Sequence, residues 1–107
     1  MKLRIRGNSI RLRLTKSEVE AFASDGFVKE VVDFGKQENA NFFYALEKSS
    51  VQNLKASFDD GKLTVSVPQV VADQWVNSED VGFEGEDGNL NVLVEKDFAC
   101  LKPREGE

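Results

Sequence analysis

Histidine is absent from the 107 residues, and cysteine occurs once, as Cys100. Histidine is the commonest general base and metal ligand, so its absence excludes histidine-based catalysis and histidine metal sites. A single cysteine excludes an internal disulfide and fits a reducing compartment, which favours a cytoplasmic protein. With no histidine to activate the thiol and apolar neighbours on both sides, we expect Cys100 to be a buried apolar group.

The sequence also lacks long apolar runs, glycine-rich phosphate loops and paired metal-ligand cysteines. No stretch is long enough to span a membrane, and no apolar signal segment follows the charged N-terminus. A chain of this length is expected to form one domain that buries its own core. We predict that this single domain covers residues 1–101 and that residues 102–107 form a frayed polar tail.

Charge is distributed unevenly along the chain. The net charge is −5, yet Met1–Ser17 holds six cations and no acid, while the remaining residues hold eight of the fourteen cations and all nineteen acids. A protein with net negative charge binds nucleic acid poorly, so we expect no nucleic-acid partner. A local cluster of cations can still hold a small anion.

The basic segment Lys2–Leu14 reads as a β-hairpin. Its apolar residues alternate with cations, which is the period of a strand with one buried face. A turn at Gly7-Asn8 would pair Ile5 with Ile10 and Leu3 with Leu12, and would put every apolar residue on one face. The other face then carries Lys2, Arg4, Arg6, Arg11 and Arg13.

A helix is expected directly after this hairpin. Thr15 and Glu18 have the spacing of a capping box, and Leu14 before the cap can contact Val19 in a hydrophobic staple. Asp25-Gly26 supplies the stop signal.

The same pattern recurs 53 positions along the chain. The residues Leu3, Ile5, Ile10, Leu12, Leu14, Val19, Phe22 and Val28 correspond to Ala56, Phe58, Leu63, Val65, Val67, Ala72, Trp75 and Val81. Asp60-Gly61 falls where the first turn is and would pair Phe58 with Leu63. We therefore predict internal repeats over residues 2–48 and 54–97, each a strand–strand–helix–strand–strand unit.

The predicted strands are the two of the Lys2–Leu14 hairpin, followed by Phe27–Phe34, Asn41–Lys48, Leu54–Asp59, Lys62–Val67, Val81–Glu86 and Asn89–Asp97, with a second helix over Pro68–Val76. In the third strand, Val28, Val32 and Phe34 should point inward. In the last hairpin, a turn at Asp87-Gly88 would pair Phe83 with Val92. The fold class is α+β: a duplicated ββαββ unit forming an antiparallel eight-stranded sheet, curled toward a barrel with two helices packed outside.

Two resemblances follow from these patterns. The segments Arg4–Val19 and Val94–Leu101 resemble the two ends of a family of small uncharacterised bacterial proteins, which supplies no function. The duplicated unit is similar in architecture to the CYTH-like triphosphate tunnel proteins, wide barrels that bind triphosphates with inward basic residues and metal with inward glutamates. Their Glu-x-Glu-x-Lys motif corresponds here to Lys2–Arg6, which contains no acid, so no catalytic residue is carried over.

The arginines of the hairpin have two interpretations. As an anion site, Arg4, Arg6, Arg11 and Arg13 would bind phosphate or carboxylate oxygens with guanidinium groups. Alternatively, they pair with carboxylates on neighbouring strands, and exposed ion pairs of that kind contribute only about 0.2–1 kcal/mol each.

Glu84, Glu86 and Glu95 are weak candidates for a magnesium or manganese site, because carboxylate oxygens are the ligands that hard cations prefer. The alternative is a solvated strand face, which is the usual place for glutamate.

Three functions remain open from sequence. The first is a non-enzymatic binding or accessory module whose arginines hold a small phosphorylated or polyanionic ligand or an acidic protein. The second is a structural or protein-interaction subunit. The third is a metal-dependent phosphate-ester enzyme of the tunnel type, and only this alternative needs a cofactor, magnesium or manganese.

Overall fold

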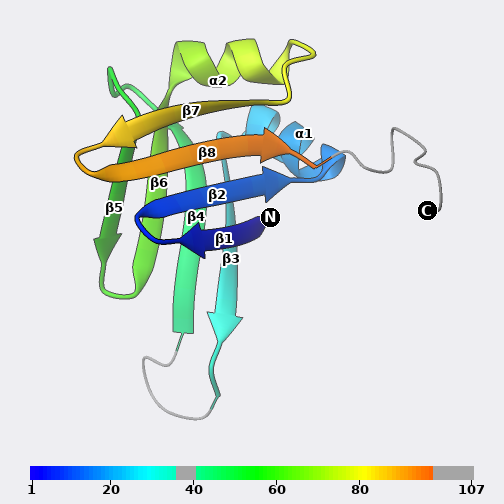
Figure 1. The fold of residues 1–107 in the computed structure, drawn as a ribbon. Coiled ribbons are helices and arrows are strands. Elements are labelled where there is room, and N and C mark those ends of the chain that lie inside the picture. Colours follow the sequence, from blue (N-terminus) through cyan, green and yellow to red (C-terminus); the bar gives the residue numbers. More distant parts are fainter. Residues whose placement is uncertain (36–40, 98–107) are drawn as a thin grey trace, which may run out of the picture.

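The computed structural model describes residues 1–35 and 41–97, so the predictions for Cys100 and for the tail lie outside the described part. Within it the protein is α+β (Figure 1). The elements are β1 (Lys2–Arg6), β2 (Ser9–Leu14), α1 (Lys16–Asp25), β3 (Phe27–Asp33), β4 (Asn41–Ser49), β5 (Lys55–Asp59), β6 (Lys62–Pro68), α2 (Gln69–Val76), β7 (Gly82–Asp87) and β8 (Leu90–Lys96).

These strands form two sheets of four, which corrects the predicted single sheet of eight. The first sheet has the order β1-β2-β8-β7 and the second has the order β3-β4-β6-β5. Both sheets are mixed, because β2 pairs parallel to β8 and β4 pairs parallel to β6. Each sheet therefore joins a hairpin from the first half of the chain to a hairpin from the second half.

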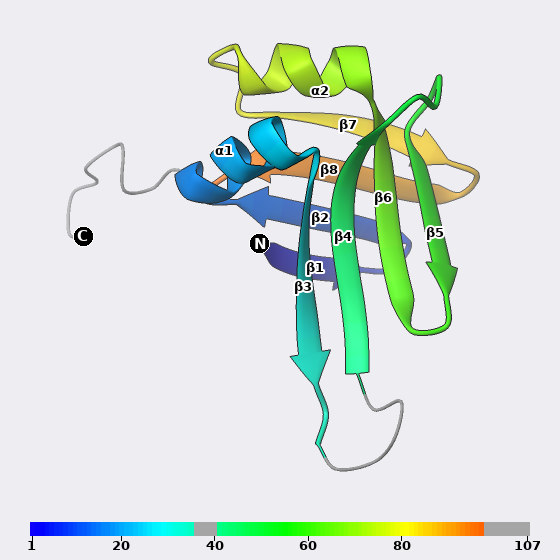
Figure 2. The ribbon, with the colours of Figure 1, turned by 180° about the vertical axis from the view of Figure 1, so that it is seen from behind.

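The expectation of a barrel is also wrong. Each sheet keeps two edge strands, β1 and β7 in the first and β3 and β5 in the second. Alternation of apolar and polar residues determines which face of a hairpin is buried, but it does not determine which other hairpin lies beside it. Here α1 leads the chain from the hairpin β1–β2 into the second sheet, and α2 leads it from the hairpin β5–β6 back into the first sheet. The strands therefore stack as two layers (Figure 2).

The registers of the first and third hairpins are confirmed. Ile5 pairs with Ile10 across the Gly7-Asn8 turn, and Gly7 has φ 56°, the left-handed conformation that this position requires. Phe58 pairs with Leu63 across Asp60-Gly61.

The predicted register of the last hairpin is wrong. Phe83 pairs with Val94 rather than with Val92, and the turn is Gly88-Asn89, with Gly88 at φ 62°. Glycine takes the first central position of this turn, as it does in the first hairpin, and the predicted turn would have put it second. Val81 consequently lies outside β7 and is 62% exposed.

The hydrophobic core lies between the two sheets and beneath the helices, which pack side by side (Figures 1 and 2). Phe22 of α1 and Trp75 of α2 are buried, with their ring centroids 6.0 Å apart in an edge-to-face arrangement. These two matching residues of the repeat therefore anchor the core from the two helices. The start of α1 is also as predicted, because Thr15 and Glu18 form the complete capping box, and Gly26 ends the helix at φ 87°.

The outer end of β3 departs from the prediction. Val32 is 39% exposed and Phe34 is 71% exposed, although both were expected to point into the core. In Figure 1, β3 and β4 extend past β1, the edge strand of the first sheet. None of the described strands or helices covers this part of the second sheet. Periodicity correctly indicated the face of Val32, which pairs with Phe42, but burial also requires a covering layer.

Candidate functional site

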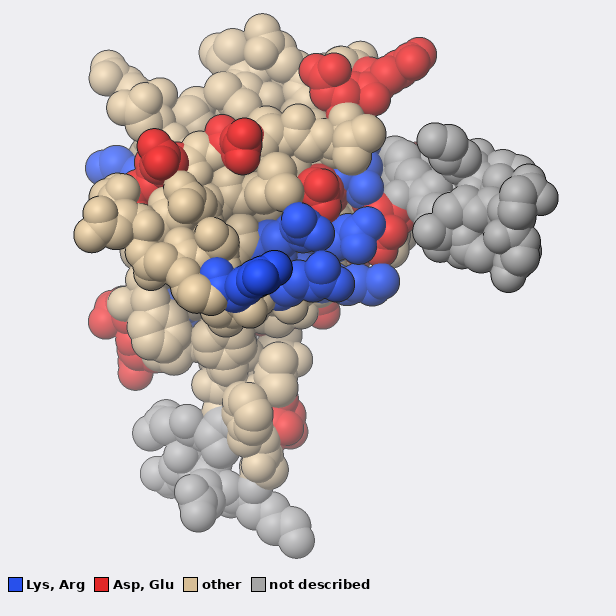
Figure 3. All heavy atoms as spheres, viewed as in Figure 1, with Lys and Arg blue, Asp and Glu red and all other residues tan. Residues whose placement is uncertain are grey.

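The predicted site residues come together on the outer face of the first sheet. We call Arg4, Arg6, Arg11 and Arg13 the arginine face; the first two lie on β1 and the last two on β2. Figure 3 shows these cations as a continuous basic band, with acidic side chains above and beside it. Arg4 and Arg11 are direct cross-strand partners, as predicted. Like charges in that position repel, so the band favours a counter-charge.

The β2 half of the arginine face has internal partners. Nε of Arg11 lies 3.6 Å and Nε of Arg13 lies 3.5 Å from Oε1 of Glu95, and Nη2 of Arg13 lies 3.7 Å from Oδ1 of Asp97. The same aspartate also pairs with Lys2 at 3.1 Å. Nε of Arg13 is buried without a hydrogen bond, so its contact with Glu95 is an ion pair of loose geometry. The interpretation by internal pairing therefore holds for β2.

The β1 half of the arginine face is different. Arg4 and Arg6 are exposed, and within residues 1–35 and 41–97 neither side chain has a hydrogen-bond or ion-pair partner. A hollow of about 480 Å³ lies beside them, lined by Arg4, Arg6, Arg11, Glu84, Asn91 and Leu93 among others. Three guanidinium groups at one hollow can supply several charge-assisted hydrogen bonds to a single anion.

The three candidate metal ligands do not gather in the same way. Glu84 and Glu86 are exposed on β7, whereas Glu95 on β8 is paired with two arginines. In the described part of the chain, no group of three or more histidine, cysteine, aspartate or glutamate side chains is arranged to hold a metal ion.

The second sheet provides an internal comparison for the arginine face. The pairing of β6 with β5 and β4 matches the pairing of β2 with β1 and β8, so positions can be compared one by one. The positions of Arg4, Arg6, Arg11 and Arg13 correspond to Ser57, Asp59, Thr64 and Ser66. The outer face of this sheet is therefore built without arginine at these positions. The fold itself does not require the basic residues.

The two sheets meet at a charged corner that the sequence did not predict. The amino group of Met1 forms ion pairs with Glu18 of α1 and with Glu30 of β3, the latter at 2.8 Å. The hydroxyl of Tyr44 donates a hydrogen bond to the carbonyl oxygen of Met1 at 2.7 Å. The only signal of this charged corner in the sequence is that Glu30, a charged residue, occupies one of the inward-facing positions of β3.

Electrostatics at this corner favour the ion pairs. Burial opposes the charge on the Met1 amine, but the hydrogen bonds and negative charges of Glu18 and Glu30 outweigh it and raise its pKa above 8.0. Burial likewise opposes the charge on Glu18, yet hydrogen bonds from the Met1 amine and the Thr15 amide lower its pKa below 4.5. Burial, and then the charges of both glutamates, raise the pKa of Tyr44.

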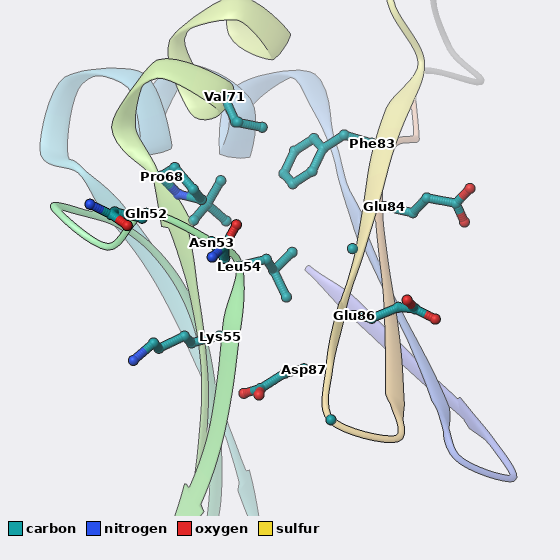
Figure 4. A pocket seen from close by; sticks show the side chains of 13 residues that line it. Gln52, Asn53, Leu54, Lys55, Pro68, Val71, Phe83, Glu84, Glu86 and Asp87 are labelled. Carbon is teal, nitrogen blue, oxygen red and sulfur yellow. The ribbon is translucent and has the colours of Figure 1, made fainter.

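The opposite corner of the molecule combines apolar and polar side chains. Leu54 packs against Gly85, where an added Cβ would lie 3.1 Å from the leucine Cβ. Figure 4 shows Leu54 facing Phe83 across the hollow of about 480 Å³ between β5 and β7, with Asp87 reaching toward β5. Oδ2 of Asp87 accepts a hydrogen bond of 2.9 Å from the backbone amide of Ala56. Sequence reasoning missed this contact because β5 and β7 are distant along the chain.

Comparison with known proteins identifies the family. The sequence profile of a family of unknown function, DUF7009, matches residues 1–107. The chain belongs to this family. No curated protein matches the sequence.

Membership of DUF7009 agrees with the expected small uncharacterised family and assigns no activity. No helix in the described part of the chain is long and apolar enough to cross a membrane. Function must therefore be argued from the geometry of the arginine face.

Proposed function

We propose that this protein is a non-enzymatic binding module whose arginine face holds an anionic ligand, either a small polyanion or an acidic segment of a partner protein. One observation carries the proposal: the side chains of Arg4 and Arg6 are exposed and have no ion-pair partner among the described residues, whereas the matching positions of the second sheet hold Ser57 and Asp59. The fold does not need these two neighbouring arginines, and the repulsion between their positive charges destabilises it. A bound anion would offset that repulsion.

The chemistry of the arginine face fits phosphate and carboxylate oxygens. A guanidinium group presents its N–H donors in a planar fork that matches either group. Each hydrogen bond between charged partners contributes about 1.5–3 kcal/mol. A ligand with several negative charges is favoured because it can contact Arg4, Arg6 and Arg11 together, all of which line one hollow.

The alternative of a structural or interaction subunit is supported by a different observation. Glu95 and Asp97 already neutralise much of the charge on Arg11 and Arg13. On that interpretation the charges serve solubility and pairing between strands. The two alternatives differ in what Arg4 and Arg6 do, because those two residues have no such partners in the described part of the chain.

A thermal-shift titration with tripolyphosphate tests the proposal. At about one hundred times the dissociation constant the ligand stabilises the fold by about 2.7 kcal/mol. That corresponds to a rise in Tm of roughly 10 °C for a domain of this size. The rise should shrink when ionic strength is increased from 20 to 200 mM, because salt screens exposed charges.

The variant Arg4→Gln/Arg6→Gln should abolish most of this rise. The matched control is Lys55→Gln/Lys62→Gln, which removes the same charge from the outer face of the second sheet and should leave the rise unchanged. Equal loss in both variants would show a non-specific response to net charge. No rise with tripolyphosphate or any other polyanion would leave the interaction-subunit alternative.

A further inference from the structure

The exposed edge of β1 has backbone groups without a partner among residues 1–35 and 41–97. In a hairpin with a two-residue turn, the residues next to the turn form a hydrogen-bonded pair, and such pairs then alternate along the ladder. Arg6 and Ser9 flank the turn, so Arg4 and Arg11 are also hydrogen-bonded to each other. The N–H and C=O groups of Leu3 and Ile5 consequently point away from β2. Since β1 is an edge strand, they face its open side.

The equivalent edge of the second sheet, on β5, is occupied at one position. Ala56 on β5 corresponds to Leu3, and its outward amide donates to Oδ2 of Asp87. In the structure Val28 matches Phe83, not Val81 as the sequence pattern predicted, because Val28 pairs with Leu46 as Phe83 pairs with Val94. Four residues farther along the two strands, Val32 therefore corresponds to Asp87. Valine cannot accept that hydrogen bond. The amide of Leu3 therefore has no counterpart of the carboxylate that occupies the β5 edge.

An apolar surface lies beside the open edge. Tyr44 is fixed to the start of β1 by its hydrogen bond to Met1, and Phe42 is the next residue of β4 on the same face, with its ring 5.9 Å from that of Tyr44. Figure 1 shows β4 running across the direction of β1, so a step along β4 leads away from the edge of β1. From Tyr44 to Phe42 this step is about 6.6 Å, and a strand added to β1 would lie roughly 4.8 Å from it. Phe42 thus lies about where a strand added to β1 would run.

We call Val32, Phe42 and Phe58 the apolar shelf. Val32 pairs with Phe42 across β3 and β4, and the ring of Phe58 lies 6.2 Å from that of Phe42. Phe58 is 67% exposed, although it faces the same side as core residues. Figure 1 shows the lower half of the second sheet extending past β1, with no strand in front of it.

We propose that the open edge of β1 binds an extended segment of a partner protein, with alternating acidic and apolar residues, as a fifth strand of the first sheet. The added backbone would pair with the free groups of Leu3 and Ile5. Its side chains would point alternately toward the apolar shelf and toward the outer face, beside Arg4 and Arg6. This inference rests on the proposed anion preference of the arginine face and names its ligand.

Charge complementarity argues for an acidic partner rather than a second copy of this chain. Cross-strand neighbours are about 4.5–5.5 Å apart, so β1 paired with another β1 would bring arginines of two copies together on the outer face. Acidic residues at the same positions of a partner strand would instead face Arg4 and Arg6. Arginine at an edge in this way discourages self-association while it admits a strand of opposite charge.

A fluorescently labelled peptide of four Glu-Val repeats, with blocked ends, tests the inference by fluorescence anisotropy on the full chain. We expect it to bind at least tenfold more tightly than a peptide of the same composition ordered Glu-Glu-Val-Val. The second peptide cannot put all its acids on one face and all its valines on the other. Equal binding of the two peptides would overturn the inference, as would no binding of either.

Backbone pairing is tested on the peptide itself, which avoids unfolding the protein. N-methylation of every valine and N-methylation of every glutamate block the two opposite edges of the peptide strand. One of the two modified peptides should lose at least tenfold in affinity, and the other should stay within about threefold of the unmodified peptide. Unchanged binding of both would show that no strand is added.

The apolar shelf is tested by neighbouring residues on β3. Val32→Ser removes an exposed apolar side chain from the shelf, and we expect roughly tenfold weaker peptide binding. Val31→Ser is the matched control, because Val31 is 52% exposed on the opposite face of the same strand, and it should bind as the unchanged protein does. Equal loss in both variants would contradict the placement on the shelf.

These outcomes separate the inference from the proposed function. If tripolyphosphate raises the Tm through Arg4 and Arg6 but the alternating peptide does not bind, the arginine face holds a small anion and only the added strand is wrong. If neither ligand binds, the proposed function fails as well. A dimer of the chain alone in analytical ultracentrifugation that Val32→Ser dissolves would show that a second copy occupies the edge.

Discussion

Glu18 shows how much one side chain does in this small protein. Its carboxylate caps the amide of Thr15 and also binds the amine of Met1, so it joins the start of α1 to the start of β1. The capping role of Glu18 can be separated from the effect of its charge, because glutamine also completes a capping box but carries no charge. The ion pair is therefore open to a direct test.

We predict that Glu18→Gln lowers the free energy of unfolding by about 1.5–3 kcal/mol between pH 5 and pH 7.5. The folded pKa of Glu18 is depressed, so its contribution is present above pH 4.5 and is lost as pH falls through the folded value. The folded pKa of the Met1 amine is raised, so its contribution is present below pH 8.0 and is lost as pH rises through the folded value.

Urea denaturation at a series of pH values measures this difference. The gap between the unchanged protein and Glu18→Gln should close toward pH 3 and narrow at high pH. Glu20→Gln, an exposed neighbour on α1, is the control and should change stability by less than about 0.5 kcal/mol. A gap that does not vary with pH would show that the ion pair contributes nothing.

Glu95 is expected to compete with any anion for the arginines of β2. We predict that Glu95→Gln tightens tripolyphosphate binding about three- to tenfold, because it removes a negative charge within a few ångströms of the site. Isothermal titration calorimetry measures the change. The control is Glu47→Gln, at the matching position of the second sheet, where Ser66 replaces arginine as the partner. Weaker binding after Glu95→Gln would place the anion elsewhere.

At the scale of elements, the two helices begin in different ways. Thr15 caps α1 with its side chain, whereas Pro68 precedes α2 and makes no capping hydrogen bond. Proline fits a helix start because no intrahelical partner exists for its missing N–H group. A side-chain hydroxyl therefore contributes to the start of α1 and not to the start of α2.

We predict that Thr15→Ala destabilises the protein by about 1 kcal/mol, since an uncapped helix start leaves a backbone amide unpaired. The midpoint of urea unfolding should fall while the slope stays the same. Lys16→Ala, in the first turn of α1, is the control and should change the midpoint little. Equal stability of Thr15→Ala and the unchanged protein would mean that water replaces the cap at no cost.

Hairpins were also the elements that the sequence predicted best, with one instructive failure. Asp60-Gly61 and Gly7-Asn8 were located correctly because the turn residues and the apolar alternation on both sides agree. In the last hairpin, turns at Asp87-Gly88 and Gly88-Asn89 keep the same residues inward. Alternation therefore does not distinguish them, and only the backbone conformation at Gly88 decides.

At the scale of the whole molecule, the exchange of hairpins between the halves makes each half incomplete. Every four-stranded sheet contains one hairpin from residues 1–50 and one from residues 51–107. The parallel contacts β2–β8 and β4–β6 join the two halves through central strands, which carry buried residues such as Leu12 and Val65.

We predict that residues 1–50 and residues 51–107, produced separately, are unfolded as monomers and regain structure when mixed. Isolated hairpins are at best marginally stable in water, and each half would expose half of the core. Far-UV circular dichroism of the separate and mixed fragments measures this, with dilution of the mixture as the control. A folded monomeric fragment at micromolar concentration would contradict the exchange of hairpins.

The candidate site was predictable only in part. The sequence indicated the basic face and the pairing of Arg4 with Arg11, because both follow from alternation within one hairpin. It did not show that Glu95 pairs with the arginines of β2 and not with those of β1, since that depends on β8 lying beside β2. Distribution of charge between neighbouring strands is a property of sheet order.

From the sequence alone, the strands and helices, the cap of α1, two hairpin registers and the face of each strand were determined, because backbone preferences and alternation act over a few neighbouring residues. The tertiary structure decided the rest: two sheets instead of one, parallel central pairs, the exposed shelf of Val32 and Phe58, and the free edge of β1. These features depend on which distant segments meet. That choice is made by the packing of whole surfaces, and no local pattern along the chain specifies it.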